Sequence, residues 1–237
     1  MSVAMPRAVL FDVFGTLVDW RGSVIAGLSA FGASRGIVAD WAEIADSWRR
    51  AYRPSMDRVR RGVVPWTLLD DLHRDALMEI TRRHGIGPLD DGDYEQLVRL
   101  WHRLAAWPDV VAGLRRLKEV AVIGPLSNGH LALQVALARR NGFPWDVTFG
   151  SDMFRHYKPD AEVYLGACDF LGLAPGDVML AAAHNDDLAA AASFGLRTAF
   201  ISRPAEFGAA TGDRARASGA WDVVVDSVGA LAEALGG

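Results

Sequence analysis

Short apolar runs alternate with longer segments of helical periodicity along most of this chain, and this alternation restricts the folds open to it. Five runs are short and apolar enough to be strands buried on both faces: Arg7–Phe11, Val120–Leu126, Val178–Ala182, Thr198–Ile201 and Val223–Val225. Helical spacing occupies Val110–Leu117, Leu131–Arg140, Ala161–Leu171 and Leu188–Phe194. Right-handed crossovers between parallel strands place such helices on both faces of one sheet. We therefore predict an α/β fold with a Rossmann-like, three-layer core and a parallel sheet.

One segment, from about Trp20 to Ile86, breaks this rhythm because it contains successive amphipathic helices with no strand between them. Pro54, Pro65 and the Gly85–Pro88 segment punctuate it, and we expect Asp90–Trp107 to return the chain to the sheet. Ligands of open α/β sheets bind at the carboxyl edge, so an inserted helical cap over that edge is expected. The predicted division is a Rossmann-like core of residues 1–18 and 97–237 and a helical cap of residues 19–96.

Composition and charge narrow the class of partner. With 51% apolar and 23% charged residues, the chain can form a packed core and is not a disordered protein. Its net charge of −4 gives no positive field for nucleic acid or anionic lipid, so we expect a small-molecule ligand and neither a nucleic acid nor a membrane partner. Cys168 is the single cysteine and the chain begins without a secretory pattern, which favours the cytoplasm.

The first predicted strand runs into Asp12-Val13-Phe14-Gly15-Thr16. This places a carboxylate at the carboxyl edge of the sheet, followed by a glycine that lets the backbone turn closely around a ligand. Such a carboxylate is suited to act as a nucleophile. An Asp at this position also forms turns and helix caps, so the motif alone leaves both interpretations open.

Further polar side chains follow or approach the later strands. The second strand runs into Ser127-Asn128-Gly129-His130, whose small donors suit a substrate carboxylate or an ordinary Asn-Gly turn. Lys158 and Tyr164 follow later, and Asp186 and Asp187 come after the next strand, where either carboxylate also suits a helix cap. Turns and helix caps do not explain why these residues occur in this order near the ends of successive strands: an Asp, a Ser-Asn pair, a Lys and an Asp pair.

These motifs, DVFGT, LSNG, YKPD and the Asp pair, with a helical insertion after the first, resemble those of the haloacid dehalogenase superfamily over essentially the whole chain. The likeness is closest to the type II 2-haloacid dehalogenases, metal-free enzymes with a Rossmann-like core and a helical cap. The resemblance implies these roles: Asp12 as nucleophile, supported by Thr16; Ser127 and Asn128 on the substrate carboxylate; Lys158 with Asp187 ordering the site and the hydrolytic water; and Tyr164 at the family's tyrosine position.

The resemblance also assigns a residue of the cap. Trp48-Arg49 falls where the family carries the arginine that receives the leaving halide. A guanidinium with aromatic neighbours is chemically suited to a halide that emerges from an apolar environment. Because Arg50 and Arg53 are close in sequence, a solvated basic helix face is the alternative interpretation.

Two positions argue against the Mg²⁺-dependent phosphatases of the same superfamily. Phe14 occupies the position of their general acid, and Ala183 that of an acidic metal ligand. A halide leaves without protonation, so Phe14 is tolerable beside a haloacid substrate, and we expect no metal and no cofactor. Backbone amides near Phe14 are candidate donors to the oxyanion of ester hydrolysis. If Asp186 also faces the site, the added charge makes a cation possible again.

The chain departs from the family at the fourth motif, where it has Ala182, Ala183 and His184 in place of small polar residues. For His184 we leave three roles open: a base that activates water, a filler that narrows the substrate site, or a structural residue. A narrower site favours small halides, but the sequence does not specify the halogen.

The sequence thus predicts hydrolytic dehalogenation of short 2-haloacids, such as haloacetate or L-2-halopropionate, to 2-hydroxy acids through an ester on Asp12. Family resemblance adds an expected homodimer. The alternatives are a Mg²⁺-dependent small-molecule phosphatase and a ligand-binding member of the superfamily without turnover.

Overall fold

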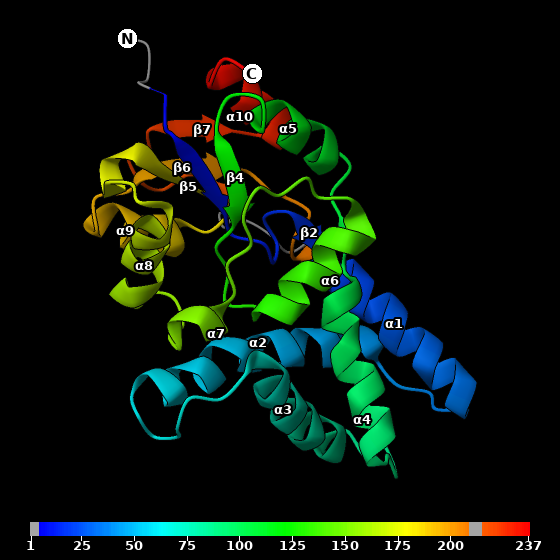
Figure 1. Ribbon diagram of the computed structural model, residues 1–237. Helices are drawn as coiled ribbons and strands as arrows, with labels where there is room; N and C mark the ends of the chain where they lie inside the picture. Colours follow the sequence, from blue (N-terminus) through cyan, green and yellow to red (C-terminus); the bar gives the residue numbers. More distant parts are fainter. Residues whose placement is uncertain (1–4, 209–214) are drawn as a thin grey trace. The chain divides into compact units, whose positions relative to one another are not determined.

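The computed structural model describes residues 5–208 and 215–237, and the chain divides into two compact units. The core unit comprises Met1–Asp19 and Ala105–Gly237, and the helical unit comprises Trp20–Leu104. Figure 1 follows the chain through both units by colour.

The core unit is built on a five-stranded sheet in which all neighbouring strands run parallel. The strands lie in the order β4 (Val122–Pro125), β1 (Ala8–Phe11), β5 (Val178–Ala182), β6 (Arg197–Ile201) and β7 (Val223–Val225). Every residue of β1 and β5 is buried, as expected for central strands covered on both faces. The five predicted strands are therefore confirmed, with shifts of one or two residues at some ends.

Helices cover both faces of this sheet, which confirms the three-layer α/β fold (Figure 1). One face carries α5 (Val110–Leu117) and α10 (Val228–Ala234), and the other carries α8 (Ala161–Leu171) and α9 (Asn185–Ser193). The remaining helices of the core unit are α6 (Leu131–Asn141), the short α7 (Ser151–Phe154) and the 3₁₀ turn η2 (Pro175–Asp177). The sequence analysis did not predict α7 and α10.

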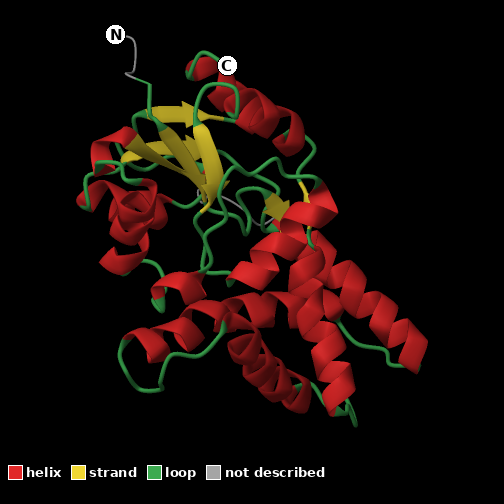
Figure 2. Ribbon diagram, viewed as in Figure 1, coloured by secondary structure: helices red, strands yellow, loops and turns green. Residues whose placement is uncertain are grey.

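A second, two-stranded sheet lies where the core unit's two chain segments end. β2 (Val18–Asp19) pairs antiparallel with β3 (Ala105–Ala106), and the Trp107 amide donates to the Leu17 carbonyl at 3.0 Å. The strands appear as short yellow pieces apart from the main sheet in Figure 2. This pairing holds the segment that leaves the core unit against the segment that returns to it.

The helical unit contains no strand within its described residues, as predicted, and consists of α1 (Trp20–Arg35), α2 (Trp41–Arg60), α3 (Leu69–Arg83), α4 (Asp91–Val98) and η1 (Arg99–Arg103). Pro54 lies inside α2 and does not bound it, which corrects the expectation from sequence. Burial of the α2 side chains Ile44, Trp48 and Met56 stabilises the helix on both sides of this proline.

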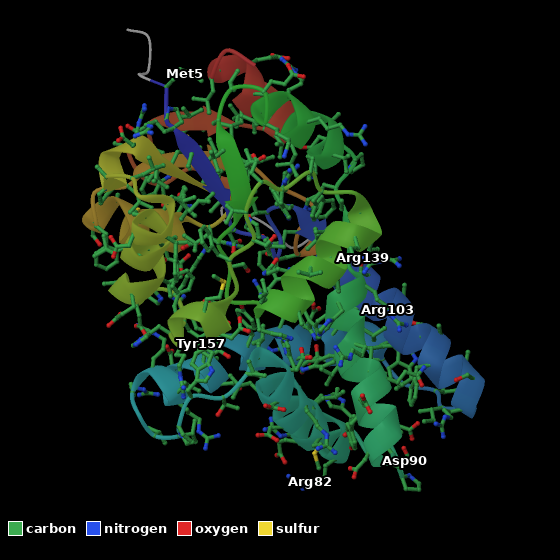
Figure 3. All side chains as sticks on the ribbon, viewed as in Figure 1. Met5, Arg82, Asp90, Arg103, Arg139 and Tyr157 are labelled. Carbon is green, nitrogen blue, oxygen red and sulfur yellow. The ribbon has the colours of Figure 1, made fainter. Side chains whose placement is uncertain are left out.

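The expectation that Asp90–Trp107 returns the chain to the sheet is wrong for most of this segment. Asp90 caps α4 through a capping box with Asp93, and it is labelled at the start of that helix in Figure 3. Trp101 is fully buried and stacks on Trp20 with ring centroids 6.3 Å apart. These contacts hold the segment in the helical unit as far as Leu104, beyond the predicted boundary at residue 96.

Among the described helices, none combines the length and the hydropathy that a membrane span requires.

Candidate active site

Three neighbouring strands, β4, β1 and β5, end at one edge of the main sheet, and each leads into a predicted site residue. Asp12 follows β1, and its amide donates to the Ala181 carbonyl of β5 at 3.0 Å. Ser127 comes shortly after β4, and His184 shortly after β5. Parallel pairing therefore gathers the motifs at the carboxyl edge, as the sequence predicts.

The two carboxylate oxygens of Asp12 have different surroundings. Oδ2 accepts a hydrogen bond from the Thr16 hydroxyl at 2.9 Å and lies 3.1 Å from Nδ1 of His184. Oδ1 faces Nζ of Lys158 at 3.6 Å. Burial acts to raise the pKa of Asp12, but the charge of Lys158 and the bonds from His184 and Thr16 outweigh it and hold the pKa well below its usual range. Asp12 is therefore an anion at neutral pH.

Lys158, Asp187 and Tyr164 form the second part of the site. Nζ of Lys158 donates to Oδ2 of Asp187 at 2.6 Å, and the Tyr164 hydroxyl donates to Oδ1 of the same carboxylate at 2.6 Å. Burial, and the charge of Asp12, raise the pKa of Asp187 against the opposing effects of Lys158 and Tyr164. The structure thus brings the predicted Lys158 and Asp187 together. Its raised pKa means that Asp187 accepts a proton more readily than a solvated Asp does.

Ser127 and Asn128 occupy the loop after β4 but make different contacts. Oδ1 of Asn128 accepts from the backbone amide of Lys158 at 2.7 Å, so the side-chain oxygen anchors the lysine loop. Oγ of Ser127 is buried and has no hydrogen-bond partner among the described residues. A buried hydroxyl without a partner is costly, and a ligand carboxylate would supply the missing bond.

Phe14 and Gly15 shape the turn that follows Asp12. Phe14 is buried, and its backbone forms an isolated bridge with Val18. Gly15 has φ +87°, a conformation that favours glycine, and its carbonyl accepts from Nε1 of Trp107 at 2.9 Å. A Cβ at Gly15 would overlap the carboxylate of Glu206. The turn therefore leaves room for a second acidic side chain beside the site.

That side chain, Glu206, is a site residue that the sequence analysis missed. It lies in the loop after β6, is 3% exposed, and places Oε1 and Oε2 at 3.0 and 3.1 Å from Nε2 of His184. Burial acts against the charged imidazole, but the charge of Glu206 and the bonds to both carboxylates raise the pKa of His184 to about 10. Because β6 pairs with β5, a carboxylate shortly after β6 was the available signal.

Arg203 and Asp109 also escaped the sequence analysis, and they support the turn after β1. Nε of the buried Arg203 donates to the Thr16 carbonyl at 2.8 Å, while its two terminal nitrogens bind both oxygens of Asp109 at 2.8 and 3.0 Å. Asp109 in turn accepts from the Val228 amide at 2.8 Å. This arrangement fixes the backbone that presents Asp12 and Thr16.

The predicted halide residue Arg49 lies on α2 in the helical unit. Its guanidinium lies over the rings of Trp20 and Tyr52, at 5.3 and 4.5 Å from their centroids. The expected aromatic neighbours are therefore present, and Arg49 is partly buried whereas Arg50 is exposed. Its role toward a halide stays a prediction.

The charges of the core unit's site bear on metal binding. Lys158 Nζ lies within reach of both Asp12 and Asp187, where it supplies positive charge between the two carboxylates. Asp186 is exposed, so it does not add a buried carboxylate to them. The charges of His184 and Glu206 are opposite in sign and offset each other, so this pair adds no net charge to the carboxylates and the ammonium group. These donors do not form a typical divalent-cation site.

Comparisons with known proteins agree with this geometry. A family model described as haloacid dehalogenase-like hydrolase matches residues 6–195. The chain is 30% identical over 205 residues to (S)-2-haloacid dehalogenase 4A of Burkholderia cepacia, with 83% of each sequence covered. Two solved structures are each 46% identical to this chain. One is a defluorinating L-2-haloacid dehalogenase, with a TM-score of 0.95, and the match covers 97% of this chain and 95% of that chain. The other is an L-2-haloacid dehalogenase, with a TM-score of 0.94, and the match covers 97% of this chain and 98% of that chain.

Proposed function

The chain belongs to the haloacid dehalogenase-like hydrolase family, and we propose that it hydrolyses the carbon–halogen bond of short 2-haloacids to give 2-hydroxy acids. The observation that carries the proposal is the placement of the Lys158 ammonium between Asp12 and Asp187, at 3.6 and 2.6 Å from their oxygens. Similarity to the 2-haloacid dehalogenases over most of the chain supports it.

In the first half of the proposed reaction, Asp12 acts as the nucleophile. A carboxylate oxygen forms a bond to the α-carbon of the substrate as the carbon–halogen bond breaks, and the halide leaves with the bonding electrons. The depressed pKa of Asp12 keeps it ionised for this attack. Ser127, whose buried hydroxyl lacks a partner in the described structure, is the proposed donor to the substrate carboxylate. Phe14 and Asn128 are proposed to border the same substrate.

In the second half, water attacks the carbonyl carbon of the Asp12 ester, and the bond to the substrate oxygen breaks. We assign proton acceptance from that water to Asp187, because its raised pKa and its bonds to Lys158 and Tyr164 suit a held, basic carboxylate. The product leaves as a 2-hydroxy acid and Asp12 is regenerated as a carboxylate.

A Mg²⁺-dependent phosphatase is not favoured as the alternative. Phe14 and Ala183 carry no oxygen ligands where the phosphatases have carboxylates, and the Lys158 ammonium already supplies charge between the acidic groups. Phosphate release that disappears with a chelator, in a protein that releases no halide, would overturn the dehalogenase proposal.

The proposal has four further parts. We propose that the helical unit, predicted from sequence as residues 19–96, acts as a cap and that Arg49 receives the halide. Cys168, the single cysteine, is buried and forms no disulfide. A free cysteine supports a reducing, cytoplasmic location. Homodimer formation rests on the family resemblance alone.

The first experiment is a halide-release screen with chloro-, bromo- and fluoroacetate and both enantiomers of 2-chloropropionate. Fluoroacetate is included because one structural relative is described as defluorinating. A phosphatase panel with and without Mg²⁺ runs beside it. We expect halide release that is independent of added metal and no phosphatase activity.

The second experiment tests Asp12 as nucleophile. One turnover in ¹⁸O-water is expected to place heavy oxygen in Asp12 and to leave the first product unlabelled, because water attacks the ester carbonyl and not the substrate. Asp12→Asn should release no halide while the fold is retained. Label in the first product would show direct attack by water on the substrate.

A further inference from the structure

His184 is held between two carboxylates, and this arrangement fixes its protonation. Nδ1 lies 3.1 Å from Oδ2 of Asp12, and Nε2 lies 3.0 and 3.1 Å from the two oxygens of Glu206. An ionised carboxylate only accepts hydrogen bonds, so each ring nitrogen must carry a hydrogen to satisfy both contacts. The imidazolium form does so, and the pKa of about 10 agrees with it.

The same contacts distinguish the two oxygens of Asp12. Oδ2 is engaged by two donors, the Thr16 hydroxyl at 2.9 Å and the His184 ring. Among the described residues, Oδ1 meets only Nζ of Lys158, at 3.6 Å. Oδ1 therefore keeps the more available lone pairs and is the attacking oxygen. Oδ2 then becomes the carbonyl oxygen of the ester.

We infer that His184 and Thr16 form the oxyanion site of ester hydrolysis, in which the Nδ1 proton of His184 stabilises the charge developing on Oδ2 of Asp12. Glu206 is the positioning residue that holds the imidazolium ring. The inference rests on the proposed function, since it concerns the second half of that reaction. It assigns side-chain donors where the sequence suggested backbone amides near Phe14.

The electron balance of this step places negative charge on Oδ2. The oxygen of water bonds to the Asp12 carbonyl carbon, the carbonyl electron pair moves to Oδ2, and one water proton passes to Asp187. When the electron pair returns, the bond from that carbon to Oδ1 breaks and the product alkoxide takes the proton held by Asp187 to become the hydroxyl of the 2-hydroxy acid. The second water proton stays on the new oxygen of Asp12 and is released to solvent, which leaves Asp12 as a carboxylate. His184 donates a hydrogen bond throughout and transfers no proton.

The surroundings of Glu206 support a built site. The Glu206 carboxylate is 3% exposed, and the turn at Gly15 has a positive φ and lacks the Cβ that would overlap it. The His184 side chain is 24% exposed, whereas the Glu206 side chain that holds it is 3% exposed. Preorganised donors of this kind act where charge appears in the transition state, because no reorganisation is needed during the step.

The test separates the two half-reactions. Rapid-quench assays with chloroacetate measure the first-turnover burst of chloride, and intact-mass spectrometry follows the carboxymethyl ester on Asp12. For His184→Ala we expect ester hydrolysis to slow about 100- to 1,000-fold, with a much smaller effect on the burst, so that the ester accumulates. His184→Asn keeps a neutral N–H donor near Nδ1 and should show a smaller loss.

Glu206→Gln separates positioning from a purely structural role. Gln keeps a hydrogen-bond acceptor for Nε2 but removes the charge that, with Asp12, raises the pKa of His184 above its usual value. In the ester, Asp12 no longer carries the charge that helps to raise the pKa of His184. Ester hydrolysis by the wild type should therefore decline as pH rises through a pKa below the value of about 10 in the free enzyme, and this decline should move to still lower pH in the variant. A base that activates water would instead gain rate as His184 loses its proton.

The outcomes are distinguishable from failure of the proposed function. If the wild type releases halide but ester hydrolysis is unchanged in His184→Ala, or if burst and turnover fall equally without an accumulated ester, the inference is overturned and the dehalogenase proposal stands. If the wild type releases no halide from any haloacid, both are overturned. If His184→Ala does not fold, His184→Asn and Glu206→Gln give the same comparison.

Discussion

Replacing Thr16 by Val gives the sharpest test of the geometry around Asp12, because a single hydroxyl makes two opposed contacts. Oγ1 of Thr16 donates to Oδ2 of Asp12 at 2.9 Å and accepts from the Ala183 amide at 2.9 Å. Thr16 is fully buried, so water does not replace either bond. Valine has nearly the same shape, and the substitution therefore removes the contacts without opening a large cavity.

The expected loss of stability follows from these two bonds. A hydrogen bond to a charged group contributes about 1.5–3 kcal/mol, and a buried amide left without a partner costs about 1–3 kcal/mol. Because the neighbours relax and the two terms are not independent, we expect Thr16→Val to lower the free energy of unfolding by roughly 3 kcal/mol. Thr16→Ser, which keeps the hydroxyl, should lose much less.

The assay combines urea unfolding with amide hydrogen exchange, because two compact units need not unfold in one transition. The Ala183 amide should lose protection in Thr16→Val and keep it in Thr16→Ser. Ester hydrolysis should also slow in the valine variant, since one of the two donors to Oδ2 of Asp12 is gone. Unchanged protection at Ala183, with stability within about 0.5 kcal/mol of the wild type, would refute this account.

Two further predictions concern proton affinity. Tyr164→Phe removes the hydroxyl that donates to Asp187 at 2.6 Å, so ester hydrolysis should slow about tenfold. Because this hydrogen bond lowers the pKa of Asp187, its removal raises that pKa, and the acid limb of the pH profile of ester hydrolysis should move to higher pH. An unmoved acid limb would argue against Asp187 as proton acceptor. The His184 pKa, raised from 6.5 to about 10, predicts that its stabilising contribution is complete below pH 6.5 and is lost as pH rises toward 10. Urea unfolding at several pH values should show the stability difference between wild type and His184→Asn shrinking over that range.

Much of the core unit could be predicted because its strands are buried on both faces. Continuous apolar runs such as Val178–Ala182 have few other interpretations, and parallel pairing then brings the ends of β1, β4 and β5 together. The positions of Asp12 and Lys158 followed from that topology and the family resemblance. The boundary near residue 96 was less accessible, because Trp101 and Leu104 are buried by tertiary packing that local periodicity does not reveal.

Glu206 shows a different limit of sequence interpretation. It is separated from His184 by a helix and a strand, belongs to none of the recognised motifs, and lies in an irregular loop after β6. Only the adjacency of β5 and β6 brings the two residues together. None of the three roles considered for His184 included a buried acidic partner, and Glu206 is such a partner, which holds the ring as a cation.

The tight turn at Gly15 has a consequence for protein engineering. Gly15 and Glu206 compete for one volume, because a Cβ at Gly15 would overlap the Glu206 carboxylate. Gly15 also has φ +87°, a conformation that other residues rarely adopt, so a shorter side chain at position 206 would not make a larger residue at position 15 tolerable. Libraries that aim to alter halogen preference should therefore keep Gly15 and vary Glu206 alone, with side chains no larger than glutamate.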